Sequence, residues 1–112
     1  MADIKSIIED GKHLDYPNSL IVFKKPEGSI KEIRKIIKDE ELNTLFFIEK
    51  IKERYFVGEI RDSDDLPLIC MDLDQYMSSN PENWIRVKDA LREHRPEILK
   101  ELGLYHEKSI YQ

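Results

Sequence analysis

The chain contains few of the residues that build cross-linked or metal-clustered sites, with one cysteine, Cys70, among its 112 residues. A single cysteine excludes an intramolecular disulfide framework and a cysteine-cluster metal site. The three histidines, His13, His94 and His106, do not have the spacing of metal ligands. We therefore expect no cofactor and no resident metal ion, and we expect Cys70 to be a small buried residue of an apolar strand.

Glycine and long apolar runs are also scarce. The four glycines are scattered, so the sequence has neither a glycine-rich phosphate loop nor a G-x-S-x-G nucleophile elbow. The longest apolar runs span about five residues, far below the roughly 18 that cross a bilayer. No apolar stretch of signal-peptide length follows the acidic residues Asp3, Glu9 and Asp10. These absences predict a cytoplasmic protein that does not bind membranes, and they favour a non-catalytic role.

What is present fits one folded domain over residues 1–112. Hydrophobic residues make up 40% of the chain, which argues against disorder. The length excludes TIM barrels and dinucleotide-binding dehydrogenases, which need about 200 residues or more.

Capping residues and the spacing of apolar residues predict four helices. Isoleucines three and four apart mark the first, over residues 2–10, and a capping box begins the second, over residues 29–38. The third begins at Pro81 and is interrupted at Pro96, because a proline ring clashes with the preceding helical turn. The fourth is short and ends at Gly103.

Four segments rich in β-branched, aromatic and other apolar residues predict strands. They cover residues 19–24, 44–50, 54–61 and 66–74. The second and third form a hairpin, so the element order is α-β-α-β-β-β-α-α. This order predicts an α+β fold with a single mixed sheet of about four strands, in which a β-α-β unit precedes an antiparallel meander. We expect the helices to pack mainly on one face of the sheet.

Two adjacent aromatic residues, Phe46 and Phe47, bear on the second face. Side chains alternate along a strand, so both faces of the sheet carry a large ring. Either helices cover both faces, for which the C-terminal helices are available, or one face is an exposed aromatic patch used for binding.

Charge is distributed unevenly along the chain. Residues 1–57 carry 11 basic and 11 acidic side chains, whereas residues 58–112 carry 7 and 12, and the whole chain has a net charge of −5. Four basic residues of the second predicted helix recur at i, i+3, i+4 and i+7, which places them on one side of that helix. They are Lys31, Arg34, Lys35 and Lys38. This side is either an ordinary solvated face or a docking surface, and the overall acidity favours a protein partner over nucleic acid.

Acidic residues gather in and after the segment that follows the hairpin. They include Asp62, Asp64, Asp65, Asp72 and Asp74. The spacing is not that of an EF-hand, because Leu66, Pro67 and Leu73 stand where an oxygen ligand, a glycine and a glutamate belong. The aspartates form either a solvated surface that can face a partner or a looser divalent-metal site.

Together these features predict a small non-catalytic protein-binding module of a regulatory, inhibitor or immunity type. The residues predicted to bind the partner are Lys31, Arg34, Lys35, Lys38, Asp62, Asp64, Asp65, Asp72 and Asp74. The partner is another protein or a second copy of the chain, which would make the protein a homodimer. Two alternatives stay open: a divalent-metal-dependent hydrolase or nuclease that uses the aspartates, and a nucleic-acid-binding protein that uses the basic helix.

Overall fold

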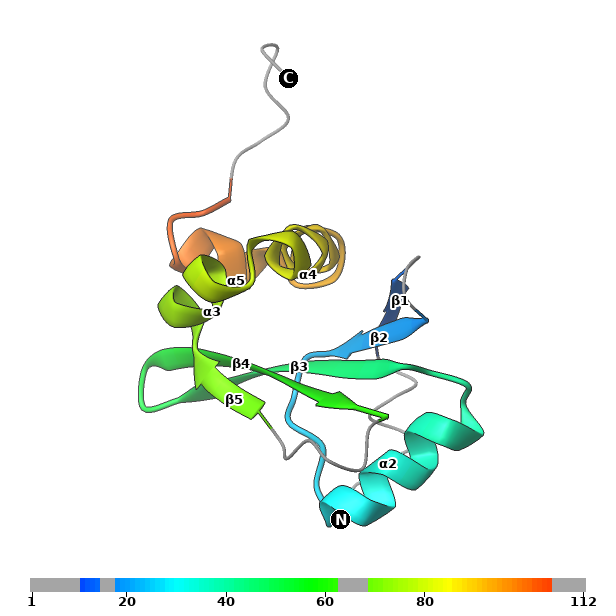
Figure 1. The fold of residues 1–112 in the computed structure, drawn as a ribbon. Coiled ribbons are helices and arrows are strands. Elements are labelled where there is room, and N and C mark those ends of the chain that lie inside the picture. Colours follow the sequence, from blue (N-terminus) through cyan, green and yellow to red (C-terminus); the bar gives the residue numbers. More distant parts are fainter. Residues whose placement is uncertain (1–10, 15–17, 63–68, 106–112) are drawn as a thin grey trace.

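A five-stranded mixed β-sheet crosses the middle of the computed structural model, and helices lie on both of its faces (Figure 1). The structure describes residues 11–14, 18–62 and 69–105. The strands are β1 (Lys12–Leu14), β2 (Ser19–Val22), β3 (Thr44–Ile51), β4 (Arg54–Arg61) and β5 (Ile69–Asp72). The helices are α2 (Ile30–Asp39), α3 (Leu73–Ser79), α4 (Pro81–His94) and α5 (Pro96–Glu101). The predicted α+β fold with one mixed sheet is confirmed, with five strands where about four were expected.

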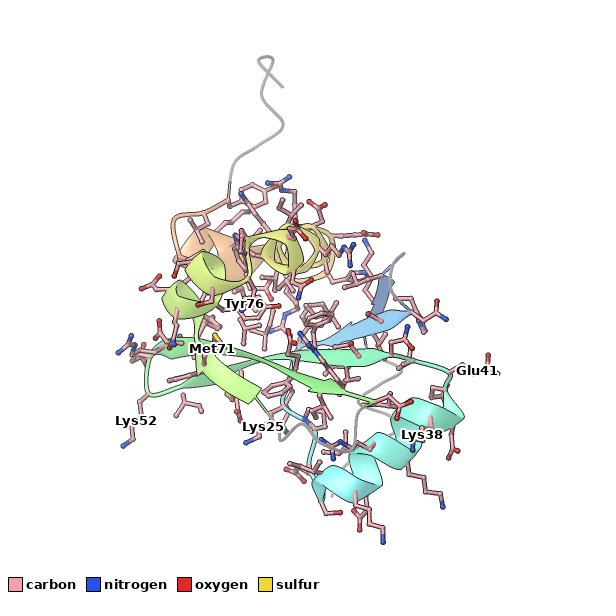
Figure 2. The ribbon with its side chains drawn as sticks, viewed as in Figure 1. Lys25, Lys38, Glu41, Lys52, Met71 and Tyr76 are labelled. Carbon is pink, nitrogen blue, oxygen red and sulfur yellow. The ribbon has the colours of Figure 1, made fainter. Side chains whose placement is uncertain are left out.

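Strand order in the sheet follows chain order, β1-β2-β3-β4-β5. The neighbours β2 and β3 are parallel and are joined through α2, whereas every other neighbouring pair is antiparallel. The predicted β-α-β unit is therefore present, and the antiparallel meander follows it. The tip of the β3–β4 hairpin is formed by Lys52 and Glu53 (Figure 2).

Each face of the sheet carries its own hydrophobic core. Phe46 belongs to the core beneath α3, α4 and α5, and Phe47 belongs to the core beneath α2. Buried members of the core beneath α2 are Leu20, Val22, Ile33, Ile37, Leu42, Leu45, Phe47 and Ile60. Three of the four described helices, α3, α4 and α5, pack on one face of the sheet, as expected, and α2 covers the other face. Each of the two rings is therefore covered from water by a different helix group.

The predicted strand over residues 66–74 ends two residues early. Its last strand residue, Asp72, accepts a hydrogen bond from the backbone N–H of Asp74 at 2.9 Å. Aspartate is a favoured N-cap residue, so the chain turns into α3 at Leu73. Asp72 and Asp74 thus occupy a cap and a first helical turn rather than one face of a strand.

The strand β1 was not predicted, because Lys12-His13-Leu14 contains a single buried side chain, Leu14. Its approach to β2 depends on Gly11, where a Cβ atom would lie 2.4 Å from the carbonyl oxygen of Ile21. A glycine therefore permits a close contact between the two backbones that a larger residue would prevent.

The C-terminal helices follow the proline and glycine signals. Pro81 begins α4, and Pro96 begins α5 directly after α4 ends. At the end of α5, Gly103 has a φ of 71°, and the N–H of Leu104 donates to the carbonyl oxygen of Leu99 at 2.8 Å. This is the hydrogen bond of a Schellman motif. The predicted helix over residues 2–10 lies outside the described residues.

None of the helices in the described ranges has both the length and the apolar character that crossing a membrane requires.

Candidate functional site

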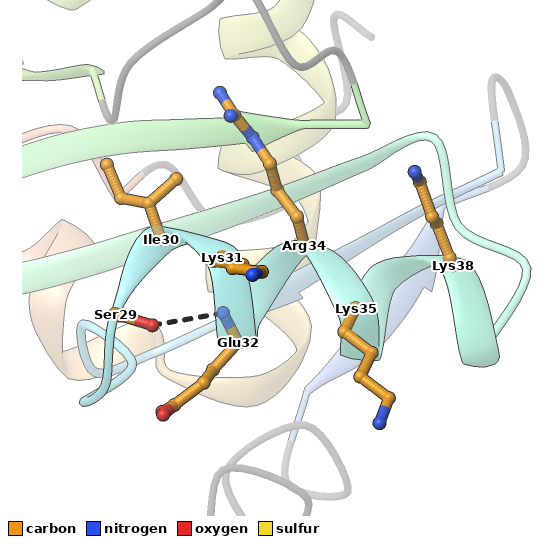
Figure 3. A pocket seen from close by; sticks show the side chains of 7 residues that line it. All are labelled: Ser29, Ile30, Lys31, Glu32, Arg34, Lys35 and Lys38. Carbon is orange, nitrogen blue, oxygen red and sulfur yellow. Dashed lines mark hydrogen bonds between the residues drawn. The ribbon is translucent and has the colours of Figure 1, made fainter.

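The four basic residues predicted to bind a partner lie on α2, where all of them line a hollow of about 860 Å³ (Figure 3). We call Lys31, Arg34, Lys35 and Lys38 the basic α2 surface. The other described residues that line the hollow are Ser29, Ile30 and Glu32. Its volume lies in the range of roughly 300–1,000 Å³ found for ligand pockets, and its described lining comes from α2 and its N-cap alone.

The sequence of α2 decides which side of the helix carries these cations. Ser29 is the N-cap, and its hydroxyl oxygen accepts a hydrogen bond from the backbone N–H of Glu32 at 3.1 Å (Figure 3). Ile33 and Ile37, one turn apart, are buried against the sheet. Their burial fixes the rotation of the helix about its axis, so that Lys31 and Lys35 lie on its exposed side and Arg34 and Lys38 lie closer to the sheet.

The basic α2 surface is wider than a single row of side chains. In Figure 3, Arg34 and Lys38 extend to the side of the helix where the sheet lies, whereas Lys35 extends to the opposite side. Arg34 is half-buried, while Lys31, Lys35 and Lys38 are exposed. The Nε and Nη2 atoms of Arg34 are buried, so the exposed positive charge of the helix comes from the three lysines.

One cation of this surface has an acidic neighbour from the sheet. The ammonium nitrogen of Lys38 lies 3.7 Å from a carboxylate oxygen of Asp62, which follows the end of β4. The backbone N–H of Asp62 donates to the carbonyl oxygen of Asn43 at 2.9 Å, which holds this aspartate next to the C-terminal end of α2. Two residues that were predicted to bind a partner separately are thus paired with each other.

Lys31 and Lys35, in the N-terminal and middle parts of the basic α2 surface, differ from Lys38 in having no acidic ion-pair partner in the described ranges. Within the described ranges, neither Lys31 nor Lys35 takes part in an ion pair or a hydrogen bond. A lysine ammonium group without a protein partner is hydrated and can exchange that water for an incoming anion. Within the described ranges, the ammonium groups of Lys31 and Lys35 therefore make no polar contact that stabilises the fold.

The predicted acidic residues do not come together in the same way. Asp72 lies opposite Phe56 in the β4–β5 pairing, and Asp62 follows Phe56 by six residues. Six residues of strand span roughly 20 Å, so Asp62 and Asp72 lie too far apart to share a cation. Asp64 and Asp65 lie outside the described residues, and the described part of the chain holds no group of three or more acidic, histidine or cysteine side chains able to hold a metal ion.

Asp72 also has structural contacts of its own. Besides capping α3, it lies 2.5 Å from a guanidinium nitrogen of Arg54. Both residues line a smaller hollow of about 230 Å³, together with Asp74 in the first turn of α3. A carboxylate that already caps a helix and pairs with an arginine has little capacity left for a further ligand.

Next to this smaller hollow, side chains of the β3–β4 hairpin contact α5. Glu101 accepts hydrogen bonds from the ammonium group of Lys50 at 2.6 Å and from the hydroxyl group of Tyr55 at 2.9 Å. The Lys50 contact first, and then the Tyr55 contact, hold the pKa of Glu101 below its usual value. The pKa of Tyr55 is raised, mainly by burial and then by the hydrogen bond to Glu101. These contacts stabilise the packing of α5 against the hairpin.

A buried carboxylate, that of Glu59, lies on the sheet face that α3, α4 and α5 cover, and it was not predicted. Glu59 is 3% exposed, and its carboxylate accepts a hydrogen bond from the Arg61 guanidinium group at 2.7 Å. The hydroxyl group of Tyr76 is buried nearby, and its pKa is raised by burial and further by the Glu59 carboxylate. The burial of Glu59 could have been predicted from the sequence, because Glu59 is two residues from Val57 and shares its core-facing side of β4.

Cys70 differs from its prediction as a buried residue, because it is exposed on β5. Among the residues that the structure describes, β5 is an edge strand that pairs with β4 alone, so the Cys70 side chain is not enclosed by the core. Partial burial raises the pKa of its thiol, although Lys25 opposes that rise. A raised pKa keeps the group in its thiol form near neutral pH, which disfavours a nucleophilic role.

Comparison of the chain with protein-family models, curated proteins and solved structures gave no match.

Proposed function

We propose that this protein is a non-catalytic binding module that recognises an acidic segment of another protein through the basic α2 surface. The observation that carries the proposal is the position of Lys31 and Lys35. Both are exposed beside a hollow, and within the described ranges neither has an ionic partner. Exposed cations of this kind attract an acidic partner and orient it on approach.

The surroundings of α2 favour a protein segment over a nucleic acid. Acidic residues flank the basic α2 surface at both ends of the helix, with Glu27 before it and Asp39, Glu40 and Glu41 at its C-terminal end. The net charge of the chain is −5. A continuous phosphate backbone would be drawn past these carboxylates, whereas a short acidic peptide can contact the lysines alone.

The proposal is tested by capture of partners from a lysate of the source organism with three baits. These are the wild-type protein, the charge-reversed variant Lys31→Glu/Lys35→Glu, and the control variant Lys52→Glu/Lys100→Glu. The control changes the net charge equally, at two exposed lysines outside the basic α2 surface. Melting curves of all three proteins establish that each bait is folded.

We expect at least one protein, quantified by mass spectrometry, to be retained by the wild type and by the control and lost with Lys31→Glu/Lys35→Glu. The retention should weaken with added salt, because surface charge interactions are screened within about 10 Å at 0.1 M salt. Identical captured sets, or no captured protein with any bait, would overturn the proposal. Loss of capture after nuclease treatment of the lysate would also overturn it, since the ligand would then be a nucleic acid.

A further inference from the structure

The contact between Lys38 and Asp62 places a carboxylate of the chain itself on the basic α2 surface. We infer that Asp62 competes with the acidic partner for Lys38, and so acts as an internal competitor that weakens binding. This inference rests on the function proposed above and identifies one determinant of its affinity.

Backbone hydrogen bonds hold both members of the pair in place. The N–H of Asp62 donates to Asn43, whose own N–H donates to the carbonyl oxygen of Asn18 at 2.6 Å. On the side of α2, the N–H of Leu42 donates to the carbonyl oxygen of Ile37 at 2.8 Å and closes the end of the helix. The carboxylate therefore stays close to Lys38 whether or not a partner is present, as an intramolecular competitor requires.

The pair is also loose enough to be displaced. Its nitrogen-to-oxygen distance of 3.7 Å is longer than a hydrogen bond, and the side chains of Lys38 and Asp62 remain 55% and 32% exposed. Exposed pairs of this kind contribute little to folding stability. A partner carboxylate that reaches Lys38 at hydrogen-bond distance would make the stronger contact and replace Asp62.

The spacing along α2 specifies the chemistry of the partner. Lys31 and Lys35 are four residues apart and Lys38 is three residues further, which corresponds to about 6 Å and then about 4.5 Å along the helix axis. These three cations span roughly 10 Å along the helix axis. Because Lys35 and Lys38 extend to opposite sides of α2 (Figure 3), the partner is an acidic peptide with three carboxylates that crosses the exposed side of the helix obliquely. Half-buried Ile30 lies at the N-terminal end of the hollow and offers an apolar contact beside the first carboxylate.

The test uses a fluorescein-labelled hexaglutamate peptide, whose affinity is measured by anisotropy at low ionic strength. We expect Asp62→Asn to bind the peptide about two- to fivefold more tightly than the wild type, the range expected when one surface ion pair is released. The matched control is Asp39→Asn, which removes the same charge from an exposed residue adjacent to Lys38 in sequence and without an ion pair to it in the described ranges. We expect this control to give a smaller gain.

Combination with Lys38→Gln separates competition from a change of net charge. In the Lys38→Gln background, Asp62→Asn should have no larger effect than Asp39→Asn, because the cation for which Asp62 competes is absent. The inference is overturned if Asp62→Asn does not tighten binding, if Asp39→Asn matches it, or if the gain persists without Lys38.

The same titration distinguishes this failure from a failure of the proposed function. If Lys31→Glu/Lys35→Glu abolishes peptide binding while Asp62→Asn has no effect, the basic α2 surface remains the binding site and only the competition is excluded. If Lys31→Glu/Lys35→Glu binds the peptide as the wild type does, both proposals are excluded.

Discussion

Tyr76 lies between α3 and the sheet (Figure 2). Its buried hydroxyl group is close to the ion pair of Glu59 and Arg61. The tyrosine side chain is fully buried, so its ring contributes to the core while its hydroxyl group is removed from water. Burial disfavours the ionised form, and a neighbouring carboxylate disfavours it further. The folded protein should therefore become less stable as the pH rises into the alkaline range.

We predict that the wild type loses stability relative to Tyr76→Phe as the pH rises above 10. The unfolded chain releases the tyrosine proton near pH 10, whereas the folded chain retains it because the pKa is raised. The unfolded state then binds fewer protons, and the free energy of unfolding falls by up to about 1.4 kcal/mol per pH unit. Urea unfolding of both proteins between about pH 8 and pH 11 measures the difference. Stability profiles that stay parallel over this range would contradict the prediction.

Individual residues also show what the sequence could predict about the candidate site. The side of α2 that carries Lys31, Arg34, Lys35 and Lys38 was predictable, because helical periodicity depends on sequence neighbours alone. The pairing of Lys38 with Asp62 was not predictable. It depends on where α2 lies over the end of β4, which is determined by packing between distant segments.

At the scale of single elements, the tip of the β3–β4 hairpin carries residue types that do not suit its backbone conformation. Lys52 and Glu53 both have positive φ angles, 49° and 69°. Two central residues of this kind form a type I′ turn, which Asn-Gly adopts with much less strain. Lys50 lies 3.7 Å from Glu53, but this exposed pair contributes little.

We predict that Lys52→Asn/Glu53→Gly stabilises the protein by about 1–2 kcal/mol, because it relieves left-handed backbone strain at two positions. Chemical denaturation measures the gain. The control Lys52→Ala/Glu53→Ala removes the same charges and keeps a Cβ atom at both positions, so it should not stabilise. Equal stability of the two double variants would show that charge rather than backbone conformation accounts for the change.

Element boundaries were predictable where one residue type determines the backbone. Pro96 separates α4 from α5, and Gly103 ends α5, as the sequence indicated. The boundary between β5 and α3 was not predictable in this way. Met71 and Leu73 continue an alternating strand pattern, and it is the Asp72 side chain, which caps α3, that marks the end of the strand.

At the scale of the whole molecule, two hydrophobic cores share one sheet. Trp84 packs against the core beneath α3, α4 and α5, and Phe47 lies in the core beneath α2. The chain was predicted to be a single domain, so the two cores should unfold together. The sheet supplies the coupling, since β3 sends side chains into both.

We predict that Phe47→Ala lowers the unfolding midpoint reported by Trp84 fluorescence, although the two residues lie on opposite faces of the sheet. Removal of a buried phenylalanine ring costs about 3–5 kcal/mol, and in a cooperative domain this cost is shared by all probes. Phe46→Ala, on the Trp84 side, is the matched comparison and should produce a similar shift. A Trp84 transition that is unchanged in Phe47→Ala, with helical signal lost separately, would contradict the single-domain prediction.

The strands lie in the sheet in the same order as in the chain, and this arrangement affects how fast the protein folds. Each strand pairs with the strand that immediately precedes it, so no pairing has to wait for a segment synthesised much later. Topologies of this kind have short loop closures and fold faster than those with distant pairings. The parallel contact of β2 with β3 requires the longest closure, through α2, and is therefore expected to limit the rate at which the nascent sheet is completed.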